Sequence, residues 1–377
     1  MNDNSFSSQS IRTYRRKKNV GGTIASILII LILLAIAAVL AMVIAKIGPF
    51  APVEGGVTES DTTDTTDSLT EDAPDTSETT SGTEAPPETT EPPETADPNA
   101  IIYVSVNKSQ TDIGIGDLVL IDKTHPYSFP ETTLYSLYEY KATGSYKIAT
   151  STLYLRYEAL LHFESMTDAL VEATKKTVTD EEGLETTIYF DDVQITVAYR
   201  DYETQEVLYQ NNPKNAAAPG CSDYHSGSTI YINRYTDSGS TEDLNLSSES
   251  QWIKQNAHKY GFIFRFPTNK HKITGYNIPW QMRYVGIAHA TYMYQNNLCL
   301  EEYLQLLSDN HRYLSNHLQV NAADGMTYEI FYVQGPEEGV LKLPIPANRD
   351  YTVSGDNIGG FIVTVTVGPT ETSESDT

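Results

Sequence analysis

Apolar and polar positions are distributed very unevenly along this chain of 377 residues. Residues 23–45 contain no charged side chain and are rich in Ile, Leu, Ala and Val. A helix of this length rises about 34 Å at ~1.5 Å per residue, which is enough to cross the hydrocarbon core of a bilayer. Because the apolar region of a cleavable signal peptide is shorter, we predict that residues 23–45 form an uncleaved transmembrane helix.

The short segment before this apolar run, residues 1–22, sets the expected orientation of the helix. It carries five Lys and Arg side chains between positions 12 and 18. Basic residues next to a transmembrane helix stay preferentially on the cytoplasmic side. We therefore expect a single-pass protein of the cell membrane, with a cytoplasmic N-terminus and an extracellular globular domain.

The segment after the helix, residues 46–98, is polar and repeats Thr, Glu, Asp and Pro in motifs such as ETTEPPET. Positions 51–98 alone hold fourteen Asp and Glu and no Lys or Arg, which is more than half of the formal net charge of −25. With almost no large apolar residue this segment cannot bury a core, so we predict a disordered linker. Residues 368–377 are predicted to form a similar short acidic tail.

Globular composition begins near residue 99 and continues to about residue 367. Apolar residues recur at helical spacing over Leu155–Lys176, which predicts a helix. A shorter helix is predicted over Trp252–Tyr260 and a longer one over Val285–Leu307. Runs rich in β-branched and aromatic residues predict strands at 101–106, 117–122, 186–190, 193–200, 228–235, 328–333, 340–345 and 361–367. Because these elements mix without a regular βαβ repeat, we predict an α+β fold.

The charge balance and the two cysteines narrow the classes of function. A strongly acidic chain is a poor partner for nucleic acid, whose phosphates require a basic face. Cys221 and Cys299 are too few for a disulfide framework or a Cys-rich zinc cluster. Outside the cell the two could pair with each other, or they could be two unrelated buried thiols.

One window of the chain has the opposite charge. Residues 251–300 contain no Asp or Glu, and they carry Lys254, Lys259, Arg265, Lys270, Lys272 and Arg283. If these side chains share a face, they form a basic patch suited to an anionic wall polymer. The alternative is that they pair with acidic residues elsewhere in the fold.

Three stretches of the mixed segment carry dense motifs: VAYRDYETQEVLY (197–209), PGCSDYHSGSTIYI (219–232) and 252–290, which includes KYGFIFRFP, TGYNIPW and RYVGIAHA. Together with DLVLIDKTHPY (117–127) they resemble the signature blocks of VanY-type D-alanyl-D-alanine carboxypeptidases, which are zinc peptidases. The resemblance implies a hedgehog/D-Ala-D-Ala-peptidase-like domain over 99–310, with a central antiparallel sheet and flanking helices. A β-rich C-terminal extension is expected over 311–367.

The resemblance also implies which positions hold the chemistry of the family, and in this chain those positions are replaced. Tyr224 and Tyr231 stand where the family has a zinc-binding His and Asp. Gln281 stands at the third ligand position, and Ile278 stands at the position of the general base. The resemblance implies that Arg200 lies beside the scissile carbonyl, and the retained positions expected to bind substrate are Arg200, Tyr199, Gln205, Trp280 and Arg283.

These replacements remove every part of a zinc-dependent hydrolytic site. A catalytic zinc takes three protein ligands and a water whose proton passes to a carboxylate. A phenol with a pKa of about 10 and a neutral amide are poor zinc ligands at neutral pH, and Ile278 cannot accept a proton. We therefore expect no zinc and no other cofactor.

Neighbouring side chains do not restore the site. His225 follows Tyr224, and on a strand it would point to the opposite face. Asp223 is close to these positions but lacks a second carboxylate partner. A metal site built from other histidines is the less favoured alternative, because non-ligand positions with a packed or surface role are expected for His258, His271 and His289.

These observations favour a membrane-anchored extracellular pseudoenzyme that binds peptidoglycan stem peptides or a cell-wall partner. One alternative is an active D,D-carboxypeptidase that trims the terminal D-Ala through an atypical site. Another is a structural wall anchor in which the former cleft has no role. The expected partners are peptidoglycan or an anionic wall polymer, the membrane through residues 23–45, and an active wall enzyme.

Overall fold

Residues 100–141, 144–236, 239–244 and 248–370 are described by the computed structural model. The predicted cytoplasmic segment, the predicted transmembrane helix at 23–45, the linker and most of the acidic tail lie outside these residues. Within the described ranges, no helix is both long enough and apolar enough to cross a membrane.

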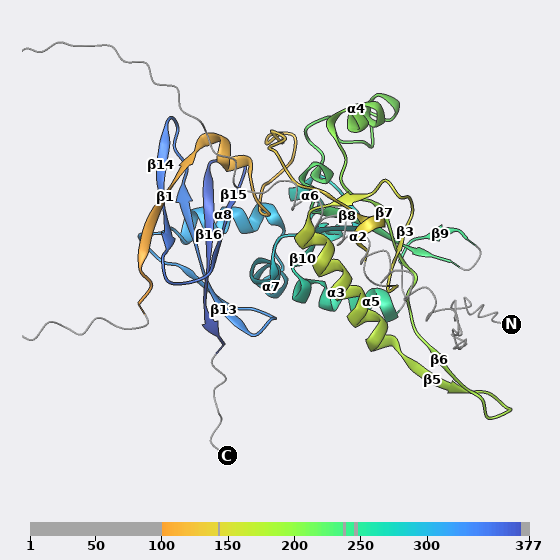
Figure 1. Ribbon diagram of the computed structural model, residues 1–377. Coiled ribbons are helices and arrows are strands. Elements are labelled where there is room, and N and C mark those ends of the chain that lie inside the picture. Colours follow the sequence, from red (N-terminus) through yellow and green to blue (C-terminus); the bar gives the residue numbers. More distant parts are fainter. Residues whose placement is uncertain (1–99, 142–143, 237–238, 245–247, 371–377) are drawn as a thin grey trace, which may run out of the picture. The chain divides into compact units, whose positions relative to one another are not determined.

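A six-stranded sheet carries the part of the chain that contains the three motif stretches (Figure 1). Its strands are antiparallel to their neighbours, except that the edge strand β3 runs parallel to β7. The strand order is β10 (Phe262–Phe266), β11 (Ile278–Tyr284), β8 (Thr229–Tyr235), β7 (Val193–Val197) and β3 (Lys147–Ile148), with β9 (Thr241–Glu242) paired to β8. The predicted mixed fold with a mainly antiparallel central sheet is thus confirmed.

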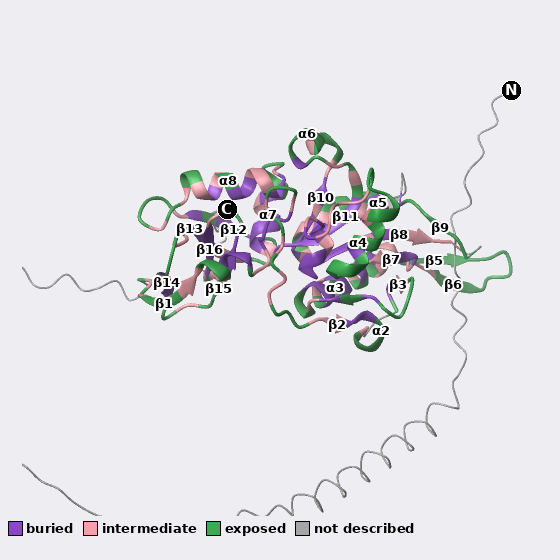
Figure 2. Ribbon diagram, turned by 90° about the horizontal axis from the view of Figure 1, so that it is seen from above, coloured by how far each residue is buried: buried purple, intermediate pink, exposed green. Residues whose placement is uncertain are grey.

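Helix α3 (Tyr157–Thr174) supplies much of the core beside this sheet. Its side chains Phe163, Met166 and Leu170 are buried together with Ile230 of β8 and Trp280 of β11. Figure 2 shows buried residues along the central strands and on α3, whereas the β5–β6 hairpin is exposed. The helix predicted from apolar spacing is confirmed, and it is two residues shorter at each end.

The C-terminal strands form a second β unit with its own core. Its four-stranded sheet has the order β12 (Leu318–Asn321), β13 (Met326–Gln334), β16 (Gly360–Pro369) and β15 (Tyr351–Gly355). A separate two-stranded sheet joins β14 (Val340–Pro346) to β1 (Tyr103–Ser109). The first strand of the predicted domain at 99–310 therefore pairs with a strand of the C-terminal extension.

Two predicted elements are wrong in detail. The long helix predicted over Val285–Leu307 is divided into α7 (Ile287–Gln295) and α8 (Leu300–Asn310). Asn297 lies between them with φ of 50°, a left-handed conformation that ends a helix.

The strand predicted at 117–122 is irregular, although its side chains are buried. Its amide groups bond to the C-terminal unit instead of a sheet neighbour: Leu118 N–H donates to the Ser354 hydroxyl and Leu120 N–H donates to the Asp356 carbonyl.

The cysteines and the shorter elements complete the described chain. Cys221 is half-buried and Cys299 is buried, and both are free thiols in the structure. Short elements around the two sheets are η1 (Gln110–Gly114), β2 (Tyr135–Ser136), α2 (Leu137–Tyr140), β4 (Tyr154–Leu155), β5 (Lys176–Thr179), β6 (Glu185–Ile188), α4 (Tyr202–Asn211), η2 (Asp223–Ser226), α5 (Ser248–Asn256), η3 (Ala257–Tyr260), η4 (Thr268–Lys270) and α6 (His271–Thr274).

A buried histidine fastens the two units to each other. His289 of α7 has its Nδ1 2.8 Å from the Tyr303 hydroxyl of α8 and its Nε2 3.0 Å from the Thr364 hydroxyl of β16. It is a packed residue, as expected for a non-ligand position. Burial lowers the pKa of His289 to about 3, so the neutral ring is the folded form at physiological pH.

This burial predicts an acid-sensitive fold. The unfolded chain binds a proton at His289 near pH 6.5, whereas the folded protein binds it only near pH 3. The stability contributed by the neutral ring is therefore complete above about pH 6.5 and is lost as the pH falls toward 3. Urea denaturation between pH 8 and pH 4.5 should show a falling free energy of unfolding. His289→Gln should lose part of that slope, and an identical slope in the variant would contradict the prediction.

Candidate functional site

The two central strands bring two of the replaced ligand positions together. Tyr231 of β8 and Gln281 of β11 are direct cross-strand partners. Paired residues of neighbouring antiparallel strands project from the same face of the sheet, so these two side chains share one face. Gln281 is buried and Tyr231 is half-buried. Ile278, at the position of the general base, begins β11 and is half-buried.

Tyr224 reaches the same place from the short helix η2. Burial raises the pKa of its phenol, and the nearby charges of Arg200, Asp223 and Tyr231 also act on it. The Arg200 guanidinium carbon lies 4.9 Å from the centre of the Tyr224 ring, within the range of a cation–π contact. The structure therefore brings Tyr224, Tyr231, Gln281 and Arg200 into one region.

Arg200 is held in place by neutral groups. Its Nη1 donates to Gln205 Oε1 at 2.8 Å, and Gln205 Nε2 donates to the Ala217 carbonyl at 2.6 Å. Gln205 is buried, so it acts as a fixed support for the guanidinium. Within the described part of the chain no carboxylate forms an ion pair with Arg200. Burial lowers the pKa of Arg200, with the Tyr224 phenol opposing the shift.

His225 fixes the backbone of this region. We expected His225 to lie on a strand and to point to the face opposite Tyr224. It lies on the short helix η2 instead, so that expectation is wrong. Its Nδ1 is 2.6 Å from the Arg200 carbonyl, and its Nε2 accepts a bond from the Gly220 N–H at 3.2 Å. Burial lowers the pKa of His225, which keeps the ring neutral. Because both ring nitrogens bond to the backbone, neither is free to bind a metal ion.

Comparison with known proteins agrees with this arrangement. A family model described as VanY, D-alanyl-D-alanine carboxypeptidase, matches residues 175–287. Over 181 residues the chain is 38% identical to a D-alanyl-D-alanine carboxypeptidase of Enterococcus faecium. By this family model, residues 175–287 form a VanY-type domain. That match covers 48% of this chain and 55% of the E. faecium protein, so it spans little more than half of the relative's length.

Two further comparisons show similarity to proteins with related names. The bifunctional D-Ala-D-Ala dipeptidase and carboxypeptidase VanXYC of Enterococcus gallinarum is 29% identical over 134 residues, which are 32% of this chain and 70% of that protein. The solved structure of the vancomycin-resistance D,D-dipeptidase VanXYg, in complex with a D-Ala-D-Ala phosphinate analogue, has the same fold. It matches with a TM-score of 0.57 and 22% identity, and it covers 70% of this chain and 99% of that one.

The side chains at the expected zinc positions do not fit zinc. Two phenols, one amide and one alkyl side chain replace the expected ligands and base, and the raised pKa values of Tyr224 and Tyr231 keep both phenols protonated. Among the described residues, no group of three His, Cys, Asp or Glu side chains is arranged to hold a metal ion. No step of zinc chemistry can therefore be assigned to this site.

Two of the expected substrate-binding residues are buried in the VanY-type domain instead. Trp280 is fully buried in the main core. Arg283 is also fully buried, and its guanidinium donates to Asp223 and to the carbonyls of Asp117 and Val119. Neither side chain reaches solvent. Tyr199 is half-buried, and its N–H donates to the Tyr154 carbonyl.

The feature that sequence reasoning missed is the ion cluster around Asp223. Arg265 Nε and Arg283 Nη1 each donate to Asp223 Oδ1 at 3.0 Å, and Thr229 donates to Oδ2 at 2.5 Å. Burial opposes ionisation of Asp223, but the two guanidinium groups outweigh it and lower the pKa of the carboxyl. A signal was available, because Arg265 interrupts an apolar strand in FIFRF and a charge there needs a buried partner.

The same cluster decides between the two interpretations of the acid-free window. Arg265 and Arg283 bind Asp223, Arg265 also binds Glu301, and Lys270 binds Glu302. Three of the six basic side chains are therefore paired with acids from outside the window. Lys254 lies 5.0 Å from the Trp280 ring centre. Half of the basic side chains of the window thus form ion pairs within the fold instead of adding to a basic surface.

The ion cluster gives a test of what holds the site together. Asp223→Asn should lower the free energy of unfolding by about 3–5 kcal/mol, because two buried guanidinium groups lose their shared counter-charge. Asp117→Asn is the matched control, since its ion pair with Arg156 is partly exposed and should contribute only about 0–1 kcal/mol. Chemical denaturation of both variants measures the difference, and similar losses would contradict the role given to Asp223.

Proposed function

We propose that this chain is a non-catalytic, membrane-anchored extracellular protein whose VanY-type domain binds peptidoglycan stem peptides at their D-Ala-D-Ala end. The supporting observation is Arg200, a largely desolvated guanidinium without a carboxylate partner among the described residues. An uncompensated, partly buried cation favours an incoming anion, and the terminal carboxylate of a peptide supplies one. The E. faecium relative's name supplies the class of peptide.

The geometry around Arg200 favours binding over accidental survival of the residue. Gln205 and the Tyr224 ring hold the guanidinium in a fixed position before any ligand arrives. A charged group fixed in advance loses little conformational entropy when it binds, which favours affinity. The other buried arginines of the domain, Arg265 and Arg283, are already paired with acidic residues.

Hydrolysis is not part of the proposal, because the side chains at the expected ligand and base positions cannot activate a water molecule. In zinc peptidases the metal lowers the pKa of its bound water to about 7, and a carboxylate takes the proton. Ile278 offers no basic atom, and the two tyrosines keep their protons. Bound peptide would therefore remain intact, which suits a protein that recognises the wall or positions an active wall enzyme.

Anchoring follows from the apolar run at 23–45 and the acidic linker at 46–98. A linker that self-repels extends, and it would hold the domain away from the anionic membrane surface. Such a tether places a peptide-binding domain within the wall layer that its ligand occupies.

Loss of catalysis can be tested by restoring the family's residues. The full chain should contain no stoichiometric zinc and should release no D-Ala from a pentapeptide that ends in D-Ala-D-Ala. The fourfold variant Tyr224→His, Tyr231→Asp, Gln281→His, Ile278→Glu should bind zinc, as measured by elemental analysis. D-Ala release that a chelator abolishes would show that the chain is an active carboxypeptidase, and stoichiometric zinc in the unmodified protein would contradict the absence of a zinc site.

Peptide binding is tested at Arg200. Arg200→Gln should weaken the binding of the same pentapeptide about tenfold to a hundredfold, the equivalent of a charge-assisted hydrogen bond of about 1.5–3 kcal/mol. The matched control is Arg312→Gln, which changes an exposed arginine of the C-terminal unit. Calorimetry measures both affinities. Unchanged affinity in Arg200→Gln would favour a structural anchor in which the former cleft has no role.

A further inference from the structure

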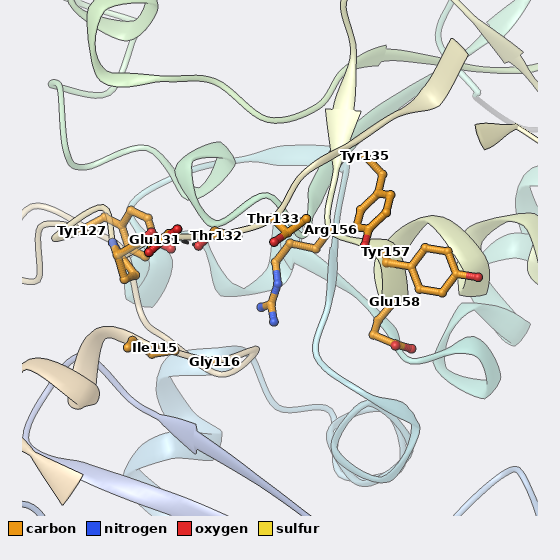
Figure 3. Close-up of a pocket in the computed structure, with 11 residues that line it drawn as sticks. Ile115, Gly116, Tyr127, Glu131, Thr132, Thr133, Tyr135, Arg156, Tyr157 and Glu158 are labelled. Carbon is orange, nitrogen blue, oxygen red and sulfur yellow. Dashed lines mark hydrogen bonds between the residues drawn. The ribbon is translucent and has the colours of Figure 1, made fainter. Parts of the chain in front are cut away.

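A cavity of about 280 Å³ lies beside the former metal site and is not lined by any of the four replaced positions. Figure 3 shows the Arg156 side chain extending into it, with Tyr127 and Glu131 on one side and Tyr135 and Tyr157 on the other. This volume is near the lower end of the range for small-molecule sites. Its lining comes from the 115–116 segment, the loop at 127–133, Tyr135 and the start of α3.

One wall of the cavity continues outward as a row of tyrosines. The ring centres of Tyr135 and Tyr157 are 5.2 Å apart, and those of Tyr135 and Tyr140 are 5.0 Å apart. Tyr157 is 46% exposed and Tyr140 is 50% exposed, so the row has open ring surface at both ends. The rings of Tyr140 and Tyr157 are inclined to the Tyr135 ring by 87° and 51°, so the two ends of the row offer two separate apolar faces.

The charges of the lining exclude an anionic ligand. Arg156 Nη1 is 2.6 Å from Asp117 Oδ1, so its charge is already compensated. The other charged residues of the lining are Glu131 and Glu158, which leaves a surplus of negative charge. Carboxylates, a guanidinium and the hydroxyls of Thr132 and Thr133 can still exchange hydrogen bonds with a neutral polyhydroxylated ligand.

Both walls of the cavity are attached to the turn that carries Tyr224. On one side, Arg156 N–H donates to the Gly227 carbonyl at 2.8 Å. Gly227 has φ of +71°, and a Cβ there would lie 2.7 Å from Leu134 Cδ2. The positive φ of Gly227, more than the contact with the flexible end of Leu134, favours glycine at this point of the wall.

On the other side, Phe129 joins the loop at 127–133 to the same turn. Its ring centre lies 4.7 Å from that of His225 and 5.2 Å from that of Tyr127. Phe129 has φ of 53°, a conformation that is strained for a bulky residue and persists only where the surroundings impose it. The cavity is thus a built feature of the fold, fixed next to the region of Arg200.

We propose that this cavity and the row Tyr140–Tyr135–Tyr157 bind a neutral carbohydrate chain. The exposed rings of Tyr140 and Tyr157 each pack against the apolar face of one sugar, and the polar lining receives hydroxyl or amide groups of the unit that enters the cavity. The inference deepens the proposed function and rests on it for its biological setting, since glycan and stem peptide are joined in peptidoglycan. The peptide end would occupy the Arg200 region, and the sugar chain would lie along the tyrosines.

The test uses the full chain and chitotetraose, a neutral chain of four N-acetylated sugars. Calorimetry should detect saturable binding that changes little between 50 mM and 500 mM salt. Tyr157→Ala and Tyr140→Ala should each weaken this binding about two- to tenfold, the range expected for one aromatic contact. Tyr351→Ala is the matched control, because it removes a 40% exposed tyrosine from β15 and should leave binding unchanged. Thermal melts confirm that each variant is folded.

The outcomes separate this inference from the proposed function. Arg200→Gln should leave chitotetraose binding intact while it weakens pentapeptide binding. The carbohydrate site alone is overturned if the protein binds the pentapeptide but not chitotetraose. It is also overturned if Tyr157→Ala and Tyr140→Ala bind chitotetraose with the same affinity as the control Tyr351→Ala. Binding of N-acetyl-lysine amide in place of chitotetraose also overturns it, because the acidic cavity would then be a cation site. Chitotetraose binding without pentapeptide binding supports the carbohydrate site and overturns the peptide proposal.

Discussion

The carboxylate of Asp223 is buried between two arginines, and the region around the former metal site depends on this contact. Arg265 comes from β10 and Arg283 from β11, while Asp223 begins the turn that carries Tyr224. Arg283 also holds the carbonyls of Asp117 and Val119, which explains how a segment that is not a strand stays buried. Asp223, Arg265 and Arg283 are all shielded from water, and buried charges are tolerated only when they are paired with one another. This pairing fixes the positions of β10, β11, the turn at Asp223 and the segment at 117–119 relative to each other.

That constraint holds the VanY-type domain together without requiring a metal ion at the expected zinc positions. In a metal enzyme the ion itself adds folding energy through its ligands. Here the turn is fastened by the Asp223 cluster and by His225, whose two ring nitrogens bind the backbone at Arg200 and Gly220. Tyr224 and Tyr231 stand at the positions where the family resemblance leads one to expect metal ligands. The Arg200 guanidinium is partly desolvated, which disfavours its charged form. A bound carboxylate would offset this unfavourable desolvation.

Much of the fold could be predicted from local pattern. The spacing of apolar residues over α3 and the β-branched runs of β7, β8, β13 and β16 gave the elements, because these faces are buried wherever the element packs. The break between α7 and α8 was missed, since Asn297 adopts a left-handed conformation that the apolar pattern does not reveal. Trp280 and Arg283 were expected to bind substrate but lie inside the domain. A sequence motif shows which residue type stands at a position, but it does not show whether the side chain points to solvent or into the core.

The sequence by itself determined the residue types Tyr224, Tyr231, Gln281 and Ile278 at the positions that the resemblance assigns to the ligands and the base, and residue type alone decides whether a side chain can bind zinc or accept a proton. It also determined the apolar run at 23–45 and the acidic linker, which are properties of composition. Only the tertiary structure decided which charges are paired. Ion pairs such as those of Asp223 join residues 42 and 60 positions apart, and that distance in sequence leaves no local pattern. The structure alone therefore distinguishes Arg200, which has no acidic partner in the described chain, from the arginines that hold the fold together.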